Sequence, residues 1–276
     1  MDLRLTNLWK DWSRHDDPPH SLKPIPVQVL HEAQRIADLS GSLALKTTAR
    51  MMWIAFFFLC RPGEYCETGY SSHLFRLADI QLSLGAAVLD IATATPALLR
   101  ASTFTSLTFT DQKNSIRGEK VGLGHSGHPY ASPTIAIADQ VLHLRANNAS
   151  PSTPLCAFCQ SGRWFSVTPD MITRLLRAAV TAIGPSCGLL PSDVSARCLR
   201  ASGAMALLCG KCDPLTIRLL GRWRSDEMIK YLHIQAPTLV KDLSRCMLQG
   251  GSYSFLPSTE PYERFHNDQS PNLYWG

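Results

Sequence analysis

Apolar side chains recur at helical spacing in the first part of the chain. Residues 27–39 place Val27 and every third or fourth residue after it on one apolar side, which predicts an amphipathic helix. Residues 43–60 read as a second helix that ends in the run MMWIAFFFLC. Ten apolar residues are too few to cross a bilayer, so this run predicts a buried helix. Pro62 and Gly63 break it.

The second half of the chain returns to helical spacing after a β-like region. Thr168-Pro169-Asp170 combines an N-cap residue, a proline at the first helical position and an acid in the first turn, which is a strong start signal. Further predicted helices cover residues 134–147, 198–209, 214–221, 225–234 and 237–248.

Alternating apolar and polar residues between these helical regions predict three strands, at 79–85, 104–110 and 120–124. The last two form a hairpin, with Lys113, Arg117 and Lys120 at or near its tip. The segment ATATPALLRAS between the first two strands has no clear pattern.

These elements predict an α+β fold that is mostly helical and carries a small antiparallel three-stranded sheet. Residues 1–26, which contain DDPP and KPIP, are expected to be an N-terminal arm or linker, and residues 27–249 one catalytic domain. Residues 250–276 have no periodicity and are expected to form a flexible C-terminal tail.

The distribution of charged residues indicates where an anionic partner could bind. The net charge of +5 is mild, but residues 197–230 hold seven Lys or Arg against three acids, so most of the excess lies in one block. The N-terminus lacks a signal-peptide layout, and the chain has nine cysteines. Reduced thiols in the nucleus or cytoplasm are therefore expected, with no membrane partner.

Two pairs of cysteines keep another class of function open. Cys156 and Cys159 form one CxxC pair, and Cys209 and Cys212 form another. Together they would suit a zinc site, and CGKC alone would suit a redox pair. The 50 residues between the pairs are more than structural zinc sites usually have, so buried or half-buried free thiols with no metal are the expected state.

The stretch LGRWRSDEMIKYLH gathers Arg222, Arg224 and Lys230 around Tyr231. Ionising a tyrosine at pH 7 costs about 4 kcal/mol, and nearby positive charge recovers part of that cost. The stretch is therefore either a phenol prepared to attack an anionic substrate or a solvated basic helix.

Four motifs in order resemble the tyrosine recombinases, the phage-integrase-like family. They are Arg61-Pro62-Gly63-Glu64 after a buried helix, Lys113 on the hairpin, Arg197-x-x-Arg200, and Leu220-Gly221-Arg222 with Tyr231 nine residues on. The order holds from about residue 27 to 245. The phrases FFFLCRPGEY, FTDQKN and LLGRWRS are most similar to recombinases of DIRS-like retroelements.

The resemblance implies cleavage and rejoining of DNA strands through a 3′-phosphotyrosine, for integration or recombination of a mobile element. Arg61 and Arg200 would bind the phosphate, Tyr231 would attack it, and Lys113 would protonate the departing 5′ oxygen. Arg61 could instead bind helix-end carbonyls or pair with Glu64, and Lys120 is a rival to Lys113 on the same hairpin. The linkage conserves bond energy, so no cofactor or metal is implied. Lys120, Arg117, Arg224 and Trp223 are the expected DNA-binding residues.

Two positions depart from the family pattern. Arg197 stands where the family usually has histidine, and Arg222 where it usually has histidine or tryptophan. By the resemblance both would join the active site, and a solvated or DNA-backbone-binding role is the alternative for each. Arginine supplies charge and hydrogen bonds but accepts no proton, so water or a preformed phenolate remain as candidates for the base. A catalytically inactive, DNA-binding relic of such an enzyme is therefore the alternative, and a type IB topoisomerase-like relaxase would share the chemistry.

The resemblance also implies partners. Double-stranded DNA would be bound by a homo-tetramer on paired sites, and residues 237–248 would dock on a neighbouring subunit. Few residues precede the catalytic domain, so either the chain is a fragment or another polypeptide supplies the N-terminal core-binding domain that completes the clamp around DNA. Without it, DNA binding would be weak and strongly salt-dependent.

Overall fold

The computed structural model describes residues 22–69, 74–110, 118–223 and 241–253. It is a mixed α/β structure, and nearly half of the described residues are helical. The α-helices are α2 (Val27–Leu39), α3 (Leu43–Phe57), α4 (Pro62–Tyr65), α5 (Pro96–Arg100), α6 (Pro133–Ala146), α7 (Pro169–Ile183), α8 (Cys198–Cys209), α9 (Pro214–Gly221) and α11 (Leu243–Gly250). Short 3-10 helices are η1 (Leu77–Asp79), η2 (Gly184–Cys187) and η3 (Pro191–Asp193).

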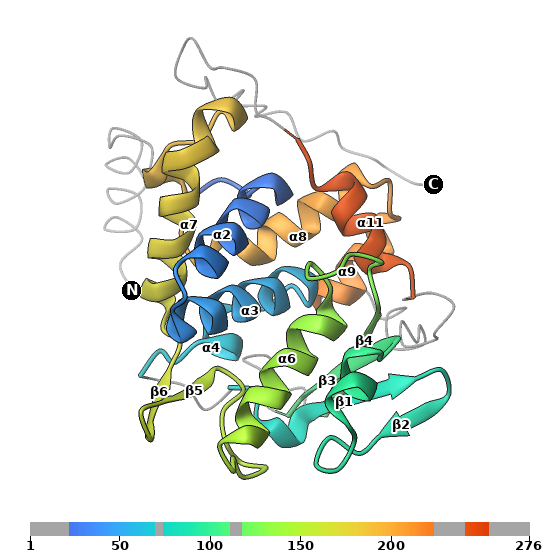
Figure 1. Cartoon of the computed structure of the whole chain (residues 1–276). Helices are drawn as coiled ribbons and strands as arrows, with labels where there is room; N and C mark the ends of the chain where they lie inside the picture. Colours follow the sequence, from blue (N-terminus) through green and yellow to red (C-terminus); the bar gives the residue numbers. More distant parts are fainter. Residues whose placement is uncertain (1–21, 70–73, 111–117, 224–240, 254–276) are drawn as a thin grey trace, which may run out of the picture.

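Helix α3 lies at the centre of the helical layer, with α2, α6, α7 and α8 packed around it (Figure 1). Its sequence explains this position, because residues 51–60 are all buried and offer no polar face to water. Trp53, Phe56 and Phe57 form an aromatic cluster within it, and the Trp53 and Phe57 rings stack with centroids 5.8 Å apart.

The prediction of a three-stranded sheet was wrong, because the sheet has four strands and a second sheet is present. The four-stranded antiparallel sheet has the order β2-β1-β3-β4, and β5 pairs with β6 in the second. Their bounds are β1 (Ile80–Leu84), β2 (Ala87–Leu89), β3 (Phe104–Phe109), β4 (Glu119–Gly124), β5 (Ala157–Gln160) and β6 (Arg163–Ser166). Helix α6 lies against β3 and β4, which joins the larger sheet to the helical layer (Figure 1).

Both predicted domain ends have described residues that pack on the fold. Ile25 is fully buried, and its N–H donates to Ser202 Oγ of α8 at 2.7 Å. Near the other end, the carbonyl oxygen of Gly251 accepts from the N–H of Val27. The packed structure therefore includes the last residues of the predicted arm and the first of the predicted tail.

The C-terminal helices are only partly described. The predicted helix 225–234 lies outside the described residues. The helix predicted at 237–248 is described from Leu243 to Gly250 as α11, and it packs on α8 and β4 of its own chain. Among the described residues, none of the helices has both the length and the apolar character needed to span a membrane.

Candidate anion-binding site

The turn after α3 supplies the backbone carbonyls of the site and positions Arg61. The helix stops at Phe57, three residues before its predicted end, because Leu59 adopts a left-handed backbone with φ of 51°. The turn leaves the carbonyl oxygens of Phe58 and Leu59 without helical partners, and it delivers the chain to Arg61 at the start of α4. Exposed carbonyls of this kind attract cationic donors.

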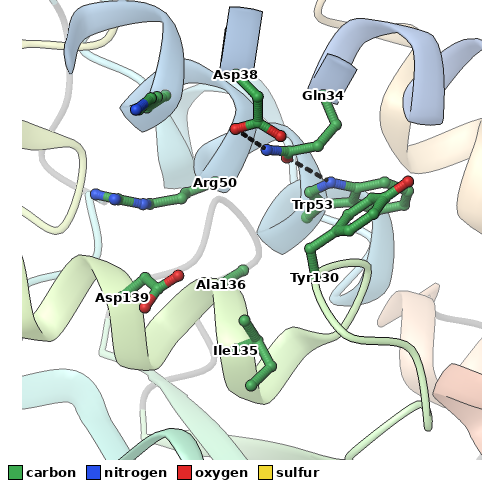
Figure 2. A pocket seen from close by; sticks show the side chains of 9 residues that line it. Gln34, Asp38, Arg50, Trp53, Tyr130, Ile135, Ala136 and Asp139 are labelled. Carbon is green, nitrogen blue, oxygen red and sulfur yellow. Dashed lines mark hydrogen bonds between the residues drawn. The ribbon is translucent and has the colours of Figure 1, made fainter. Parts of the chain in front are cut away.

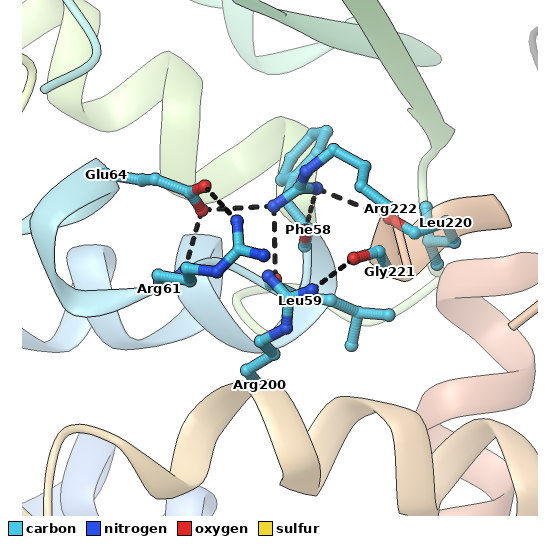
Figure 3. A network of polar contacts seen from close by, with 8 residues as sticks. All are labelled: Phe58, Leu59, Arg61, Glu64, Arg200, Leu220, Gly221 and Arg222. Carbon is cyan, nitrogen blue, oxygen red and sulfur yellow. Dashed lines mark hydrogen bonds and ion pairs between the residues drawn. The ribbon is translucent and has the colours of Figure 1, made fainter. Parts of the chain in front are cut away.

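Three guanidinium groups and one carboxylate meet at this turn (Figure 3). We call this set, Arg61, Arg200, Arg222 and Glu64, the arginine cluster. Arg61 Nη1 lies 3.3 Å from Glu64 Oε1, and Arg222 Nη2 lies 3.0 Å from Glu64 Oε2. Arg200 Nη1 donates to the carbonyl oxygen of Leu59 at 3.3 Å, and Nη2 donates to that of Gly221. With one acid against three cations, the cluster carries a formal charge of +2.

Glu64 organises the loop that carries Arg61. Its Oε2 also accepts from the backbone N–H of Arg61 at 2.7 Å, which closes the first turn of α4. Glu64 is 5% exposed, so its carboxylate is buried and contacts the arginines from within the protein. Glu64 was expected only as the partner that Arg61 could have at the helix end, and the structure contains that ion pair. Its spacing of three residues from Arg61 is the signal that predicts such a capping contact.

Burial and like charge act together on Arg200. Burial, followed by the neighbouring charges of Arg61 and Arg222, lowers the pKa of Arg200 to about 10. A guanidinium so close to two others is stabilised by any anion that enters the cluster. Trp223 holds the group from another side, with its ring centroid 4.6 Å from Arg200 Cζ.

The three arginines differ in the donors they keep for a ligand. A guanidinium has five N–H groups. Arg61 uses one of its side-chain donors on Glu64, and Arg200 uses two on backbone carbonyls. The side chain of Arg61 is 32% exposed, and Arg200 is half-buried. These two residues can therefore bind an oxyanion from solvent, each with at least two further N–H groups.

Arg197 lies apart from the cluster, although it was predicted to join it. It is exposed at the N-cap of α8, one turn before Arg200, and its side chain makes no hydrogen bond or ion pair within the described part of the chain. Its position on the same helix still leaves it available to a ligand larger than one phosphate.

The hairpin predicted to carry the lysine begins beside the cluster. Phe109, the last residue of β3, is buried, and Arg222 Cζ lies 3.7 Å from the centroid of its ring. Lys120 pairs with Thr108 on β3 and is therefore on the opposite face of the sheet from Phe109. Its Nζ donates to Gln81 Oε1. Lys113, Arg117, Arg224 and Tyr231 lie outside the described residues.

A second polar hollow lies between α2, α3 and α6 (Figure 2). Asp38 and Asp139 line it opposite Lys46 and Arg50, so its formal charges cancel. Burial lowers the pKa of Arg50. Sequence reasoning did not find this hollow, because its residues come from three separate helices. Its balanced charge makes it a poorer anion site than the arginine cluster.

The cysteine pairs lie on different elements. Cys156 and Cys159 belong to the approach to β5 and to β5 itself, and Cys209 and Cys212 to the end of α8 and the turn after it. All nine cysteines are free thiols. Within the described ranges, no three or more metal-binding side chains gather into a group that could hold an ion.

A site with a charge of +2, two arginines with spare donors and an aromatic wall can bind a phosphate or another oxyanion. Comparisons with protein-family models, with curated proteins and with solved structures find no match to this chain.

Proposed function

We propose that this chain is a DNA strand transferase of the tyrosine recombinase type, which cleaves and rejoins DNA during integration or recombination of a mobile element. The observation that carries the proposal is the convergence of Arg61 and Arg200 at the α3–α4 turn, where both side chains are partly exposed and keep unused donors. These are the two arginines that the sequence motifs assigned to the phosphate.

The charge of the cluster suits this reaction. A phosphodiester carries one negative charge, and a second develops while a nucleophile adds to phosphorus. The formal charge of +2 matches that transition state better than the ground state, which is the condition for catalysis rather than tight binding. The lowered pKa of Arg200 supports the same conclusion, because an anion relieves the repulsion among the guanidiniums.

The proposed chemistry uses two further residues. The phenol oxygen of Tyr231 forms a bond to phosphorus, and the bond from phosphorus to the 5′ oxygen breaks. The phenol proton passes to water, and Lys113 gives its proton to the 5′ oxygen. Both residues lie outside the described ranges. The hairpin segment with Lys113 follows Phe109, and the segment with Tyr231 follows Trp223, and both Phe109 and Trp223 contact arginines of the cluster.

A nicked suicide duplex with the terminal sequence of the element tests the proposal. Cleavage releases the short piece between the cut and the nick, which carries the free 5′ hydroxyl and diffuses away. The strand therefore cannot be rejoined, and the covalent adduct accumulates and is resolved on a denaturing gel. We expect an adduct with the wild-type chain, none with Tyr231→Phe, and a loss of about 100-fold or more with Arg200→Ala. The control Arg174→Ala removes an exposed arginine of α7 and leaves the adduct unchanged. An adduct that persists in Tyr231→Phe refutes the assignment of the nucleophile.

A DNA-binding protein without catalysis is the second candidate. The observation that favours it is Arg222, because this substitute for a histidine or tryptophan directs all its terminal donors into the protein. Such a protein would bind duplex DNA with a steep salt dependence and give no adduct at any salt concentration. Adding a core-binding domain and assembling a tetramer on paired sites would restore the adduct only under the first proposal.

A further inference from the structure

Arg222 occupies an unusual backbone position. It follows α9 directly and adopts a left-handed conformation with φ of 56° and ψ of 37°. Non-glycine residues rarely adopt this conformation. From this position the side chain reaches the α3–α4 turn and Glu64 (Figure 3). Only 2% of its side chain is exposed.

Every terminal donor of Arg222 already has a partner within the protein. Nη1 donates to the carbonyl oxygens of Phe58 at 3.0 Å and Leu220 at 3.3 Å. Nη2 donates to the carbonyl oxygen of Leu59 at 3.3 Å and to Glu64 Oε2 at 3.0 Å. Nε is buried without a partner in the described structure, and the guanidinium lies over the Phe109 ring. The four terminal N–H groups of Arg222 are bonded within the protein and its Nε is buried, so none of its N–H groups faces a phosphate from solvent.

Two of the four atoms that Arg222 binds also hold the other two arginines. Leu59 O accepts from Arg222 and from Arg200. Glu64 Oε2 accepts from Arg222 and from the backbone N–H of Arg61. Removing the Arg222 side chain would leave Glu64 as a buried carboxylate whose main cation is missing, and the Phe58 and Leu59 carbonyls of the α3–α4 turn would each lose a donor.

We infer that Arg222 is a positioning residue, which fixes Arg61 and Arg200 relative to each other through Glu64 and the Phe58–Leu59 carbonyls and does not itself touch the phosphate. This role replaces the predicted one as an active-site ligand, and it rests on the proposed function for the identity of the anion. Losing it misplaces both phosphate ligands together, and a misplacement of about 1 Å costs on the order of 100-fold in rate.

A substrate without a negative charge at the scissile phosphorus distinguishes a residue that neutralises charge from a residue that positions other side chains. A methylphosphonate at the scissile position replaces a charged non-bridging oxygen by a methyl group, so a residue that only neutralises this oxygen becomes dispensable. We expect Arg200→Ala to recover adduct formation on this suicide duplex at least 10-fold relative to the phosphodiester. Arg222→Met should stay defective on both substrates. Recovery of Arg222→Met equal to that of Arg200→Ala would overturn the inference.

A second measurement does not depend on catalysis, and its first step uses the wild-type chain alone. Phenylglyoxal modifies accessible guanidiniums, and peptide mass spectrometry locates the products. In the wild-type chain we expect Arg61 and Arg200 to react and Arg222 to stay unmodified until the protein unfolds. Inorganic pyrophosphate should slow the reactions of Arg61 and Arg200 together. In folded Arg222→Met, verified by circular dichroism, this protection should be lost, whereas Arg174→Met should keep it.

The cleavage assay and the modification assay distinguish a failure of the proposed function from a failure of the role inferred for Arg222. A wild-type chain that gives no adduct on either duplex, even after a core-binding domain is added, refutes the proposed function, and the modification pattern then decides the role of Arg222 by itself. Modification of Arg222 at the rate of Arg200 in the folded wild-type chain refutes the positioning role, whatever the cleavage assay gives.

Discussion

Gly203 allows α8 to approach α3, and the substitution Gly203→Ala tests whether this approach builds the arginine cluster. A Cβ at this position would lie 2.2 Å from the carbonyl oxygen of Phe56 and 2.4 Å from Leu59 Cδ2. An ordinary carbon–oxygen contact needs about 3.3 Å, so α8 would have to retreat by roughly 1 Å. The Phe56 oxygen belongs to the backbone of a buried helix and cannot swing aside.

Two free-energy terms oppose each other in this variant. Alanine favours the helical state over glycine by about 1 kcal/mol. Overpacking of a core costs about 1–3 kcal/mol, and contact with a rigid backbone places this site at the upper end. We therefore expect a net destabilisation of about 1–2 kcal/mol. For a chain of this size it corresponds to a fall in Tm of roughly 5 °C.

The retreat of α8 also moves Arg200, which lies one turn before Gly203 and donates to Leu59 O. Adduct formation should therefore fall on the order of 100-fold. Gly63→Ala is the matched control, because the nearest atom to its added Cβ is Thr68 Oγ1 at 4.0 Å. Circular dichroism melting and the suicide-duplex assay measure both effects. A Gly203→Ala chain with unchanged or raised Tm would refute the packing argument, even if no variant cleaves DNA.

Three further predictions concern other parts of the fold. Gln140→Met should lower the free energy of unfolding in urea by about 2–4 kcal/mol, because buried Gln140 donates to two carbonyl oxygens at 2.8 and 2.7 Å. Burial and the neighbouring His128 lower the pKa of His31, so on acidification the unfolded chain takes up a proton at His31 at a higher pH than the folded chain. The free energy of unfolding should therefore fall as pH drops below about 6.5, and it should fall less in His31→Asn. Cys209 is exposed and should react with an aromatic disulfide reagent in the folded chain, whereas Cys66, whose pKa is raised by burial, should react only after unfolding.

Local signals predicted the helices better than the strands. The predicted bounds of α2, α8 and α9 agree with the structure, and α7 begins at its predicted cap, because proline, capping residues and apolar spacing act within a few residues of the helix ends. Helix α3 ends early because Leu59 turns left-handed, and its apolar sequence gives no sign of that turn.

The missed strands had weak patterns. β2 is three residues long at the edge of its sheet, with mostly exposed side chains. The four-residue strands β5 and β6 join through Ser161 and Gly162, both with positive φ. A Ser-Gly pair between short apolar runs is a hairpin signal, so the β5–β6 sheet could have been predicted from the sequence. Strand β2 could not, because it depends on pairing with β1.

The role of each arginine was the hardest part to predict, because spacing along the chain does not fix side-chain direction. Arg197 and Arg200 are one turn apart on α8, yet only Arg200 reaches the α3–α4 turn. Arg222 was expected to be an active-site residue, and with its left-handed backbone the side chain is buried in the protein. That conformation costs roughly 1–2 kcal/mol, which the ion pair with Glu64 and three carbonyl contacts can offset only if the guanidinium stays buried. A buried Arg222 needs Glu64, and Glu64 in turn fixes the backbone of Arg61. The two arginines available to an anion are therefore positioned by the one that is not.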